Sequence, residues 1–194
     1  LIKQIRRQYS ETPLQNPDYG KIINEKHFDR LCDLISSGKV VYGGKSDPDT
    51  LRIEPTILDS VSFEDPVMQQ EIFGPVLPII TYDSMDEVIP KINSMAHPLA
   101  LYIFTSRRKT ARKFMEECSF GGGCINDTII HLATSDMPFG GVGESGMGSY
   151  HGRVGFETFS HYRSIVDKKT WMDLPIRYQK YTGLKEKMMR MFLK

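Results

Sequence analysis

The feature that most constrains the fold is an alternation of strand-like and helix-like segments in the middle of the chain. Residues 76–82 (VLPIITY), 99–104 (LALYIF) and 121–126 (GGGCIN) are short apolar runs of the kind that form buried strands. Between them, residues 84–92 and 106–118 carry apolar side chains at helical spacing. Strands and helices that alternate with short connections predict right-handed parallel βαβ units. The fold class is therefore α/β, built on a parallel sheet.

Capping signals mark where three helices are expected to begin. Ser84 and Glu87 form an S-x-x-E capping box, and Pro90 is expected to shorten or kink the helix that follows. Ser106 is the predicted cap of the next helix, and Asn24 is the predicted cap of an earlier amphipathic one. These signals support the helical segments independently of the apolar pattern.

Residues 156–166 (FETFSHYRSIV) depart from the alternation. They are rich in aromatic and hydroxyl side chains and predict one long strand. No helix follows to return such a strand to the parallel sheet, so we expect it to pair elsewhere. The predicted division of the chain is a body at 1–155, this protruding strand at 156–167, and a tail at 168–194.

The tail carries a charge that the whole chain does not show. Residues 168–194 hold eight basic and two acidic residues, a net +6, which leaves −5 on residues 1–167 because the whole chain carries +1. Leu184, Met188, Met191 and Phe192 recur at helical spacing among the lysines and predict a basic amphipathic helix. We favour docking of this helix on its own domain; the alternatives are weak contact with a membrane surface and cover for a partner subunit.

Composition excludes several classes of protein. Hydrophobic residues make up 40% of the 194 and charged residues 25%, which is too apolar for a disordered chain. A net charge of +1 argues against a nucleic-acid partner, and no run approaches the roughly 18 apolar residues of a membrane span. Three cysteines suit a reducing cytoplasm, which is the predicted location. Because the chain begins at Leu1 rather than Met, we expect it to be part of a longer protein.

The glycine-rich run at 138–152 contains a G-x-G-x-x-G match at Gly141, Gly143 and Gly146. That fingerprint binds a dinucleotide only where a strand leads into it and a helix leads out. Pro138 interrupts the approach, and further glycines weaken any helix that follows. We therefore interpret the run as a loop in which the backbone passes close to other elements.

A more promising site lies just before residue 76, in the sequence QQEIFGPV. The Glu71 carboxylate can accept hydrogen bonds from the two hydroxyls of a ribose, and the Phe73 ring can cover a flat heterocycle. On spacing alone, a strand cap with a core phenylalanine explains the same residues equally well.

The cysteines and histidines predict neither a nucleophile nor a metal site. Cys32 lies on the polar side of a helix, Cys118 ends a helix, and Cys124 lies in an apolar strand; none has a base at near spacing in the sequence. The histidines show no spacing typical of metal ligands, and His131 is expected to be a satisfied loop residue. The five histidines are His27, His97, His131, His151 and His161.

Several motifs in order resemble the NAD(P)-dependent aldehyde dehydrogenases. The motifs are EIFGPV at 71–76, LALYIF at 99–104, GGGCIND at 121–127 and PFGGVGESGMGSYHG at 138–152. The last of these, with FETFSHYRS at 156–164, is similar to the class 3 branch, whose substrates are fatty and aromatic aldehydes. The chain looks like the C-terminal part of the catalytic domain of such an enzyme, with an oligomerisation strand and a basic C-terminal helix.

The resemblance implies a mechanism and a set of roles. A cysteine attacks the aldehyde, a hydride passes to NAD or NADP, and a glutamate-activated water hydrolyses the thioester. Glu71 would bind the nicotinamide ribose, Phe73 would pack beside the nicotinamide, and Asn126 would support the catalytic loop. The strand 156–166 would cross to a second subunit and form a homodimer. The positions that match the aldehyde tunnel are Ile129, Leu132, Phe139 and His151.

The resemblance also implies what these 194 residues lack. The family's nucleophile motif of the Gly-Gln-x-Cys type, its general-base glutamate and its Rossmann half are expected upstream, so no catalytic residue is assigned here. We therefore expect the chain alone to be inactive. The alternative is a non-catalytic assembly or binding module derived from the family.

Overall fold

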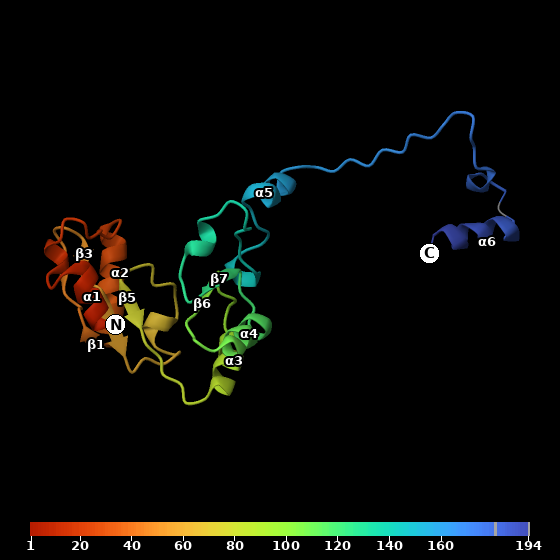
Figure 1. Ribbon diagram of the computed structural model, residues 1–194. Helices are drawn as coiled ribbons and strands as arrows, with labels where there is room; N and C mark the ends of the chain where they lie inside the picture. The colour runs from red at the N-terminus through yellow and green to blue at the C-terminus, as the bar shows by residue number, and fades with distance from the viewer. Residues whose placement is uncertain (181, 194) are drawn as a thin grey trace. The chain divides into compact units, whose positions relative to one another are not determined.

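The computed structural model describes residues 1–180 and 182–193, and the chain divides into two compact units at residues 1–95 and 96–194 (Figure 1). Unit 1 combines three helices with a three-stranded sheet and a two-stranded hairpin. Its elements are α1 (Ile2–Tyr9), α2 (Glu25–Ser36), β1 (Lys39–Tyr42), β2 (Ser46–Asp47), β3 (Arg52–Ile53), β4 (Thr56–Asp59), β5 (Val76–Pro78) and α3 (Met85–Asn93), with 3₁₀ turns η1 (Pro13–Gln15) and η2 (Pro66–Met68).

The sheet of unit 1 has the strand order β1-β4-β5. β1 pairs with β4 in the antiparallel sense, whereas β4 and β5 are parallel, with Thr56 opposite Val76. β5 is shorter than the strand predicted over 76–82, although the Ile79 N–H just beyond it still donates to the Leu58 carbonyl at 2.9 Å. The predicted strand also pairs with β4 and not with the strand that follows it along the chain.

Helix α2 supplies the core of unit 1. The Asn24 side chain accepts a hydrogen bond from the His27 N–H at 2.9 Å, which confirms the predicted cap. The apolar stripe of α2 is buried, and Leu31 and Leu58 are fully shielded from solvent. Each fully buried leucine contributes roughly 1.5–3 kcal/mol to folding. The core cluster contains Phe28, Leu31, Ile35, Ile53, Leu58, Val61, Val67 and Val76.

Helix α3 begins as the capping box predicts, in part. The Ser84 hydroxyl accepts a hydrogen bond from the Asp86 N–H at 3.2 Å, so Ser84 is the cap. Glu87 bonds back to Ser84 through its backbone N–H at 3.2 Å, and the described residues show no closing bond from its side chain. Pro90 lies inside the helix, which ends three residues later.

Unit 2 contains the clearest βαβ element. Its two strands, β6 (Ala100–Ile103) and β7 (Gly122–Ile125), are parallel and joined by helix α4 (Arg108–Glu117), as predicted (Figure 1). The strands lie so close that a Cβ on Gly123 would be 2.0 Å from the Leu101 carbonyl oxygen, which only glycine permits.

The predicted cap of α4 at Ser106 is wrong. The helix begins after Arg107, and no side chain caps it. The Thr105 hydroxyl, one residue before the predicted cap, accepts the Arg107 N–H at 3.1 Å and turns the backbone into the helix.

The glycine-rich run forms the tight loop that the sequence predicts. Phe139 and Tyr150 pair as an isolated antiparallel bridge, and a Cβ on Gly140 would be 2.1 Å from the Gly148 carbonyl oxygen. The G-x-G-x-x-G match folds into a 3₁₀ turn, η4 (Gly143–Ser145), so it does not open an α-helix. An earlier turn, η3 (Ile130–Leu132), follows β7.

The strand predicted over 156–166 is not formed. Its first residues belong to helix α5 (Gly152–Thr158), in which Arg153 and Glu157 make an i,i+4 ion pair of 2.6 Å. Residues 159–167 have no regular secondary structure. A strand requires a neighbouring strand to pair with, and no strand among the described residues pairs with this segment.

The tail forms the predicted amphipathic helix, α6 (Gly183–Phe192), preceded by a 3₁₀ turn, η5 (Pro175–Arg177). Helix α6 buries none of its residues, and the Leu184 and Phe192 side chains are 70% and 74% exposed. The predicted docking of this helix on its own domain stays a prediction. Among the described residues, no helix combines the length and the apolar character that crossing a membrane requires.

Candidate functional site

The loop between η2 and β5 presents Glu71 and Phe73 to solvent. Phe73 has a φ of +50°, a left-handed conformation that a bulky residue rarely adopts, and its side chain is 78% exposed. The alternative of a core phenylalanine is therefore wrong. The Glu71 side chain is also exposed, so its two carboxylate oxygens are open to a ligand.

Arg30 fixes the backbone of this loop. Its guanidinium donates hydrogen bonds to the backbone oxygens of Glu71 at 3.2 Å and Ile72 at 2.6 Å, and to the Gln70 side chain at 3.3 Å. Arg30 lies on α2 directly before the buried Leu31, so the helix carries the loop. Sequence reasoning missed Arg30 because its partners lie about 40 residues away along the chain.

Gly74 seats the other end of the loop against α2. A Cβ at this position would lie 2.5 Å from the Leu31 Cδ1 atom, so the backbone packs directly on the core leucine. The Pro75 carbonyl then accepts the Thr56 N–H at 2.8 Å, which joins the loop to β4. A carboxylate and an exposed ring on a fixed backbone suit a ribose diol and a planar base.

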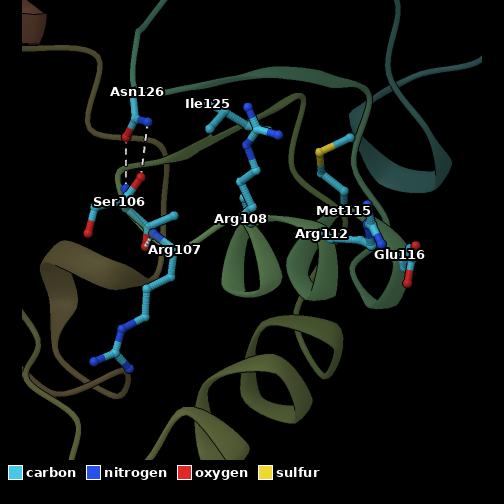
Figure 2. Close-up of a pocket in the computed structure, with 10 residues that line it drawn as sticks. Ser106, Arg107, Arg108, Arg112, Met115, Glu116, Ile125 and Asn126 are labelled. Atoms are coloured by element: carbon cyan, nitrogen blue, oxygen red, sulfur yellow. Dashed lines mark hydrogen bonds between the residues drawn. The ribbon is translucent and has the colours of Figure 1, made fainter.

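Asn126 ties together the ends of the two strands of unit 2. Its side-chain oxygen accepts the Thr105 N–H at 2.8 Å, and its amide donates to the Thr105 carbonyl at 3.0 Å (Figure 2). Its own φ of +59° turns the chain sharply after β7. These two hydrogen bonds have the pattern of a ladder step and join the residue after β7 to the residue two positions after β6.

A cavity of about 620 Å³ lies beside Asn126, between α4 and the end of β7 (Figure 2). Arg107, Arg108 and Arg112 line it with one acidic residue, Glu116, so its rim is cationic. None of the predicted tunnel residues lines this cavity.

The predicted tunnel residues come together only in part. The rings of Phe139 and His151 stack at 6.0 Å and 27°. Leu132 donates its N–H to the Ile129 carbonyl at 2.8 Å within the turn after β7, and the Ile129 side chain is 62% exposed.

A second cavity, of about 550 Å³, is lined by their neighbours and contains a pair that the sequence did not reveal. The Cys124 Sγ and His131 Nδ1 atoms lie 3.5 Å apart. The two residues are seven positions apart, so the absence of a base at near spacing in the sequence did not exclude the pair. The expectation that His131 is a satisfied loop residue is wrong, because its Nε2 atom is buried without a hydrogen-bond partner in the described part of the chain.

The other two cysteines differ from Cys124. Burial raises the pKa of the Cys118 thiol, with a smaller contribution from the charge of Glu117, so this thiol is held protonated. Cys32 is half-buried and packs against the core cluster, which corrects its predicted place on a polar face. Across residues 1–180 and 182–193, no group of three or more side chains has the composition to hold a metal ion.

The parallel strand pairs and connecting helices define a protein of the α/β class. Within that class, the chain belongs to the aldehyde dehydrogenase family, whose model matches residues 1–165.

Curated relatives agree with the class 3 resemblance. The chain is 46% identical to a 4,4'-diaponeurosporen-aldehyde dehydrogenase of Staphylococcus aureus over 196 residues, which cover 100% of the chain and 42% of the relative. It is 51% identical over 166 residues to a dimeric NADP-preferring aldehyde dehydrogenase of Mus musculus (86% and 37%). It is 45% identical over 184 residues to aldehyde dehydrogenase family 3 member B1 of Bos taurus (94% and 39%).

A solved structure shows the same fold. The substrate-bound state of Staphylococcus aureus AldH superposes with a TM-score of 0.91 at 46% identity, covering 100% of the chain and 43% of that protein. The chain thus spans about two fifths of the length of these relatives.

Proposed function

We propose that this chain is the cofactor-contacting and substrate-lining part of an enzyme that oxidises aldehydes to carboxylic acids with NAD or NADP. The observation that supports this most directly is the Glu71–Phe73 loop, which α2 fixes through Arg30 and which leaves both side chains open. The bound nicotinamide supplies the hydride acceptor. Glu71 binds the two ribose hydroxyls, and Phe73 limits the tilt of the adjacent ring.

The nucleophile is proposed to come from elsewhere in the whole protein. The 194 residues contain no Gly-Gln-x-Cys motif, and the family mechanism uses a cysteine thiolate and a glutamate-activated water. We therefore expect the pure chain to make no NAD(P)H from any aldehyde. Measurable NAD(P)H formation by the isolated chain contradicts the proposal that the nucleophile comes from elsewhere, and it favours a complete catalytic site within these residues. If the chain neither turns over nor complements the remainder of the enzyme, it is instead a family-derived assembly module.

The substrate is proposed to be a medium-to-long aliphatic or aromatic aldehyde. Ile129, Leu132, Phe139 and His151 are the proposed lining, and three of these four side chains are apolar. The Staphylococcus aureus relative is named as a 4,4'-diaponeurosporen-aldehyde dehydrogenase, so its own name gives an aldehyde as the compound it acts on.

The cofactor role is tested by Glu71→Gln in the intact protein. The amide keeps one acceptor oxygen but loses the charge, so the ribose is held less firmly and hydride transfer slows by about ten-fold, or ~1.4 kcal/mol. Glu25→Gln, another exposed carboxylate in unit 1, is the matched control and leaves turnover unchanged. Pre-steady-state NAD(P)H formation is the measurement. Equal rates for Glu71→Gln and wild type contradict the assigned role.

We further propose that residues 156–166 mediate a homodimer. The Tyr162, Ile165 and Val166 side chains are 75%, 72% and 90% exposed on a segment without internal strand pairing, which supports an interchain role. Light scattering of the intact protein with and without residues 159–167 tests this: a shift from dimer to monomer is expected. An unchanged mass contradicts the proposal.

The basic tail is proposed to contact membrane surfaces weakly, because α6 leaves both its apolar and its cationic side chains open. Co-sedimentation with anionic vesicles is expected to depend on residues 168–194. Equal sedimentation without the tail argues against membrane contact.

The three cysteines are free, which supports the proposed cytoplasmic location.

A further inference from the structure

We propose that Cys124 and His131 form a reactive thiol site that takes α,β-unsaturated carbonyl compounds by conjugate addition. The proposal depends on one pair of atoms, one cavity and the contrast with the other two cysteines. It does not rest on the proposed aldehyde oxidation, because neither residue has a part in that function.

The fold brings the pair together by reversing the chain after β7. Cys124 lies on β7, and His131 lies seven residues later in η3. Asn126 and Ile129, with φ values of +59° and +64°, turn the intervening loop back over the strand. The Sγ and Nδ1 atoms meet at 3.5 Å, within hydrogen-bonding range for sulfur.

The surroundings of His131 hold its ring in place. The Tyr102 ring packs edge-on against it at 5.8 Å, and the Phe139 ring lies 6.4 Å away on a tilted plane. Gly122 leaves room for the ring, because a Cβ there would lie 3.0 Å from the His131 Cδ2 atom. An imidazole held beside a thiol is the arrangement that activates a cysteine, since it accepts the thiol proton and stabilises the thiolate as a neighbouring cation.

The cavity indicates the chemical class of the partner. Besides Cys124 and His131, it is lined by the apolar side chains of Ile125, Ile130 and Met137, and its volume of about 550 Å³ admits a small organic molecule. A thiolate is a soft nucleophile and prefers a soft electrophilic carbon. An apolar chain that ends in a conjugated carbonyl satisfies both conditions. Of the described residues, two other titratable groups face the pair: Asp127 lines the cavity, and Tyr102 packs on the His131 ring.

The reaction is balanced without any further reagent. His131 takes the Cys124 thiol proton, and the Sγ electron pair forms a bond to the β-carbon of the electrophile. The carbon–carbon π bond breaks, and its electrons move to the α-carbon and carbonyl oxygen. The imidazolium then returns its proton to the α-carbon. The net change is the addition of S–H across the double bond, with no oxidant or reductant.

The chain provides its own reference thiols. Cys118 is buried with a raised pKa, and Cys32 is half-buried against the core with no histidine at hydrogen-bonding distance among the described residues. General-base catalysis by a positioned side chain contributes roughly 10²–10⁴-fold, so a Cys124 rate at least about ten-fold above those of the reference thiols is expected.

The test uses trans-2-nonenal at pH 7, followed by borohydride reduction and peptide mass mapping of the 194-residue chain. Cys124 is expected to be alkylated at least ten-fold faster than Cys32 and Cys118. His131→Gln is expected to lower the Cys124 rate to that of Cys32 at pH 7. At pH 10, where hydroxide removes thiol protons directly, the variant and wild type are expected to react alike. His27→Gln, an exposed histidine on α2, is the matched control and leaves the rate unchanged.

Three results overturn the proposal. One is a Cys124 rate at pH 7 no higher than that of Cys32 in the wild-type chain, which requires no variant to fold. Another is an unchanged Cys124 rate in a His131→Gln chain whose circular dichroism matches wild type. A His131→Gln rate that stays low at pH 10 also counts against it, because that result means the variant blocks access and does not remove a base.

Discussion

The packing of Gly74 on Leu31 predicts a defined cost for adding one methyl group. In Gly74→Ala, the new Cβ lies 2.5 and 2.6 Å from the two Leu31 methyl carbons. Carbon atoms in contact are normally ~3.5–4.0 Å apart, so Leu31 must move by about 1 Å. Leu31 has no exposed surface into which it can swing. The strain therefore passes to α2 and the core cluster.

Overpacking of this kind costs roughly 1–3 kcal/mol. For a chain of this size, that corresponds to a fall in Tm of roughly 2–12 °C. Gly20→Ala is the matched control, because nothing lies within 4 Å of its added Cβ. Its effect is expected to stay within about 0.5 kcal/mol.

Urea unfolding followed by far-UV circular dichroism measures the change in the free energy of unfolding. Tryptophan fluorescence does not, because the single tryptophan, Trp171, is 81% exposed and lies outside unit 1. Hydrogen exchange of the α2 amides shows whether the lost stability belongs to unit 1.

A double-mutant cycle decides whether the reasoning holds. Leu31→Ala alone removes a fully buried side chain and costs roughly 2–5 kcal/mol. In that background the Gly74→Ala methyl enters vacated space, so its additional cost falls to about zero. Additive effects of the two substitutions refute the contact as the source of the strain.

Three further predictions concern other positions. Burial, aided by the charges of Tyr9 and Glu54, raises the pKa of Tyr19 from 10.0 to about 12. The contribution of Tyr19 to the free energy of unfolding is therefore complete below pH 10 and is lost as pH rises from 10 through 12. In urea titrations, Tyr19→Phe is expected to remove this pH dependence. Arg30→Ala in the intact protein raises the KM for NAD(P) by about ten-fold, ~1.4 kcal/mol, with Arg30→Lys intermediate; equal KM values argue against the loop contacts. Gly123→Ala forces a Cβ to 2.0 Å from a backbone oxygen and destabilises unit 2 near the upper end of the roughly 1–3 kcal/mol range, measured by its loss of amide protection.

Local signals predicted the elements whose causes are local. The Asn24 cap and the apolar stripe of α2 are readable from sequence because every partner lies within one or two helical turns. Ser106 failed as a cap because a competing hydroxyl, Thr105, stands one residue earlier. The helical start of residues 156–166 was missed because the Arg153–Glu157 pair begins before the aromatic run that suggested a strand.

The candidate site was likewise predictable from sequence only where its causes are local. The identities of Glu71 and Phe73 were readable, but their exposure depends on Arg30, whose partners lie about 40 residues away. The meeting of Cys124 with His131 depends on two left-handed residues that carry side chains, Asn126 and Ile129. Sequence patterns favour glycine at such positions, so nothing in the spacing indicated that the chain reverses there.

The two parallel strand pairs have a consequence for how the chain acquires its structure. Thr56 pairs with Val76, and Ala100 pairs with Gly122, so each parallel pair joins residues only 20 or 22 positions apart. Loop closure over such short separations costs little entropy, and contact order of this kind accompanies fast folding. Each unit holds both partners of its own pair. A ribosome-bound chain can therefore complete the first pair while the second is still being synthesised.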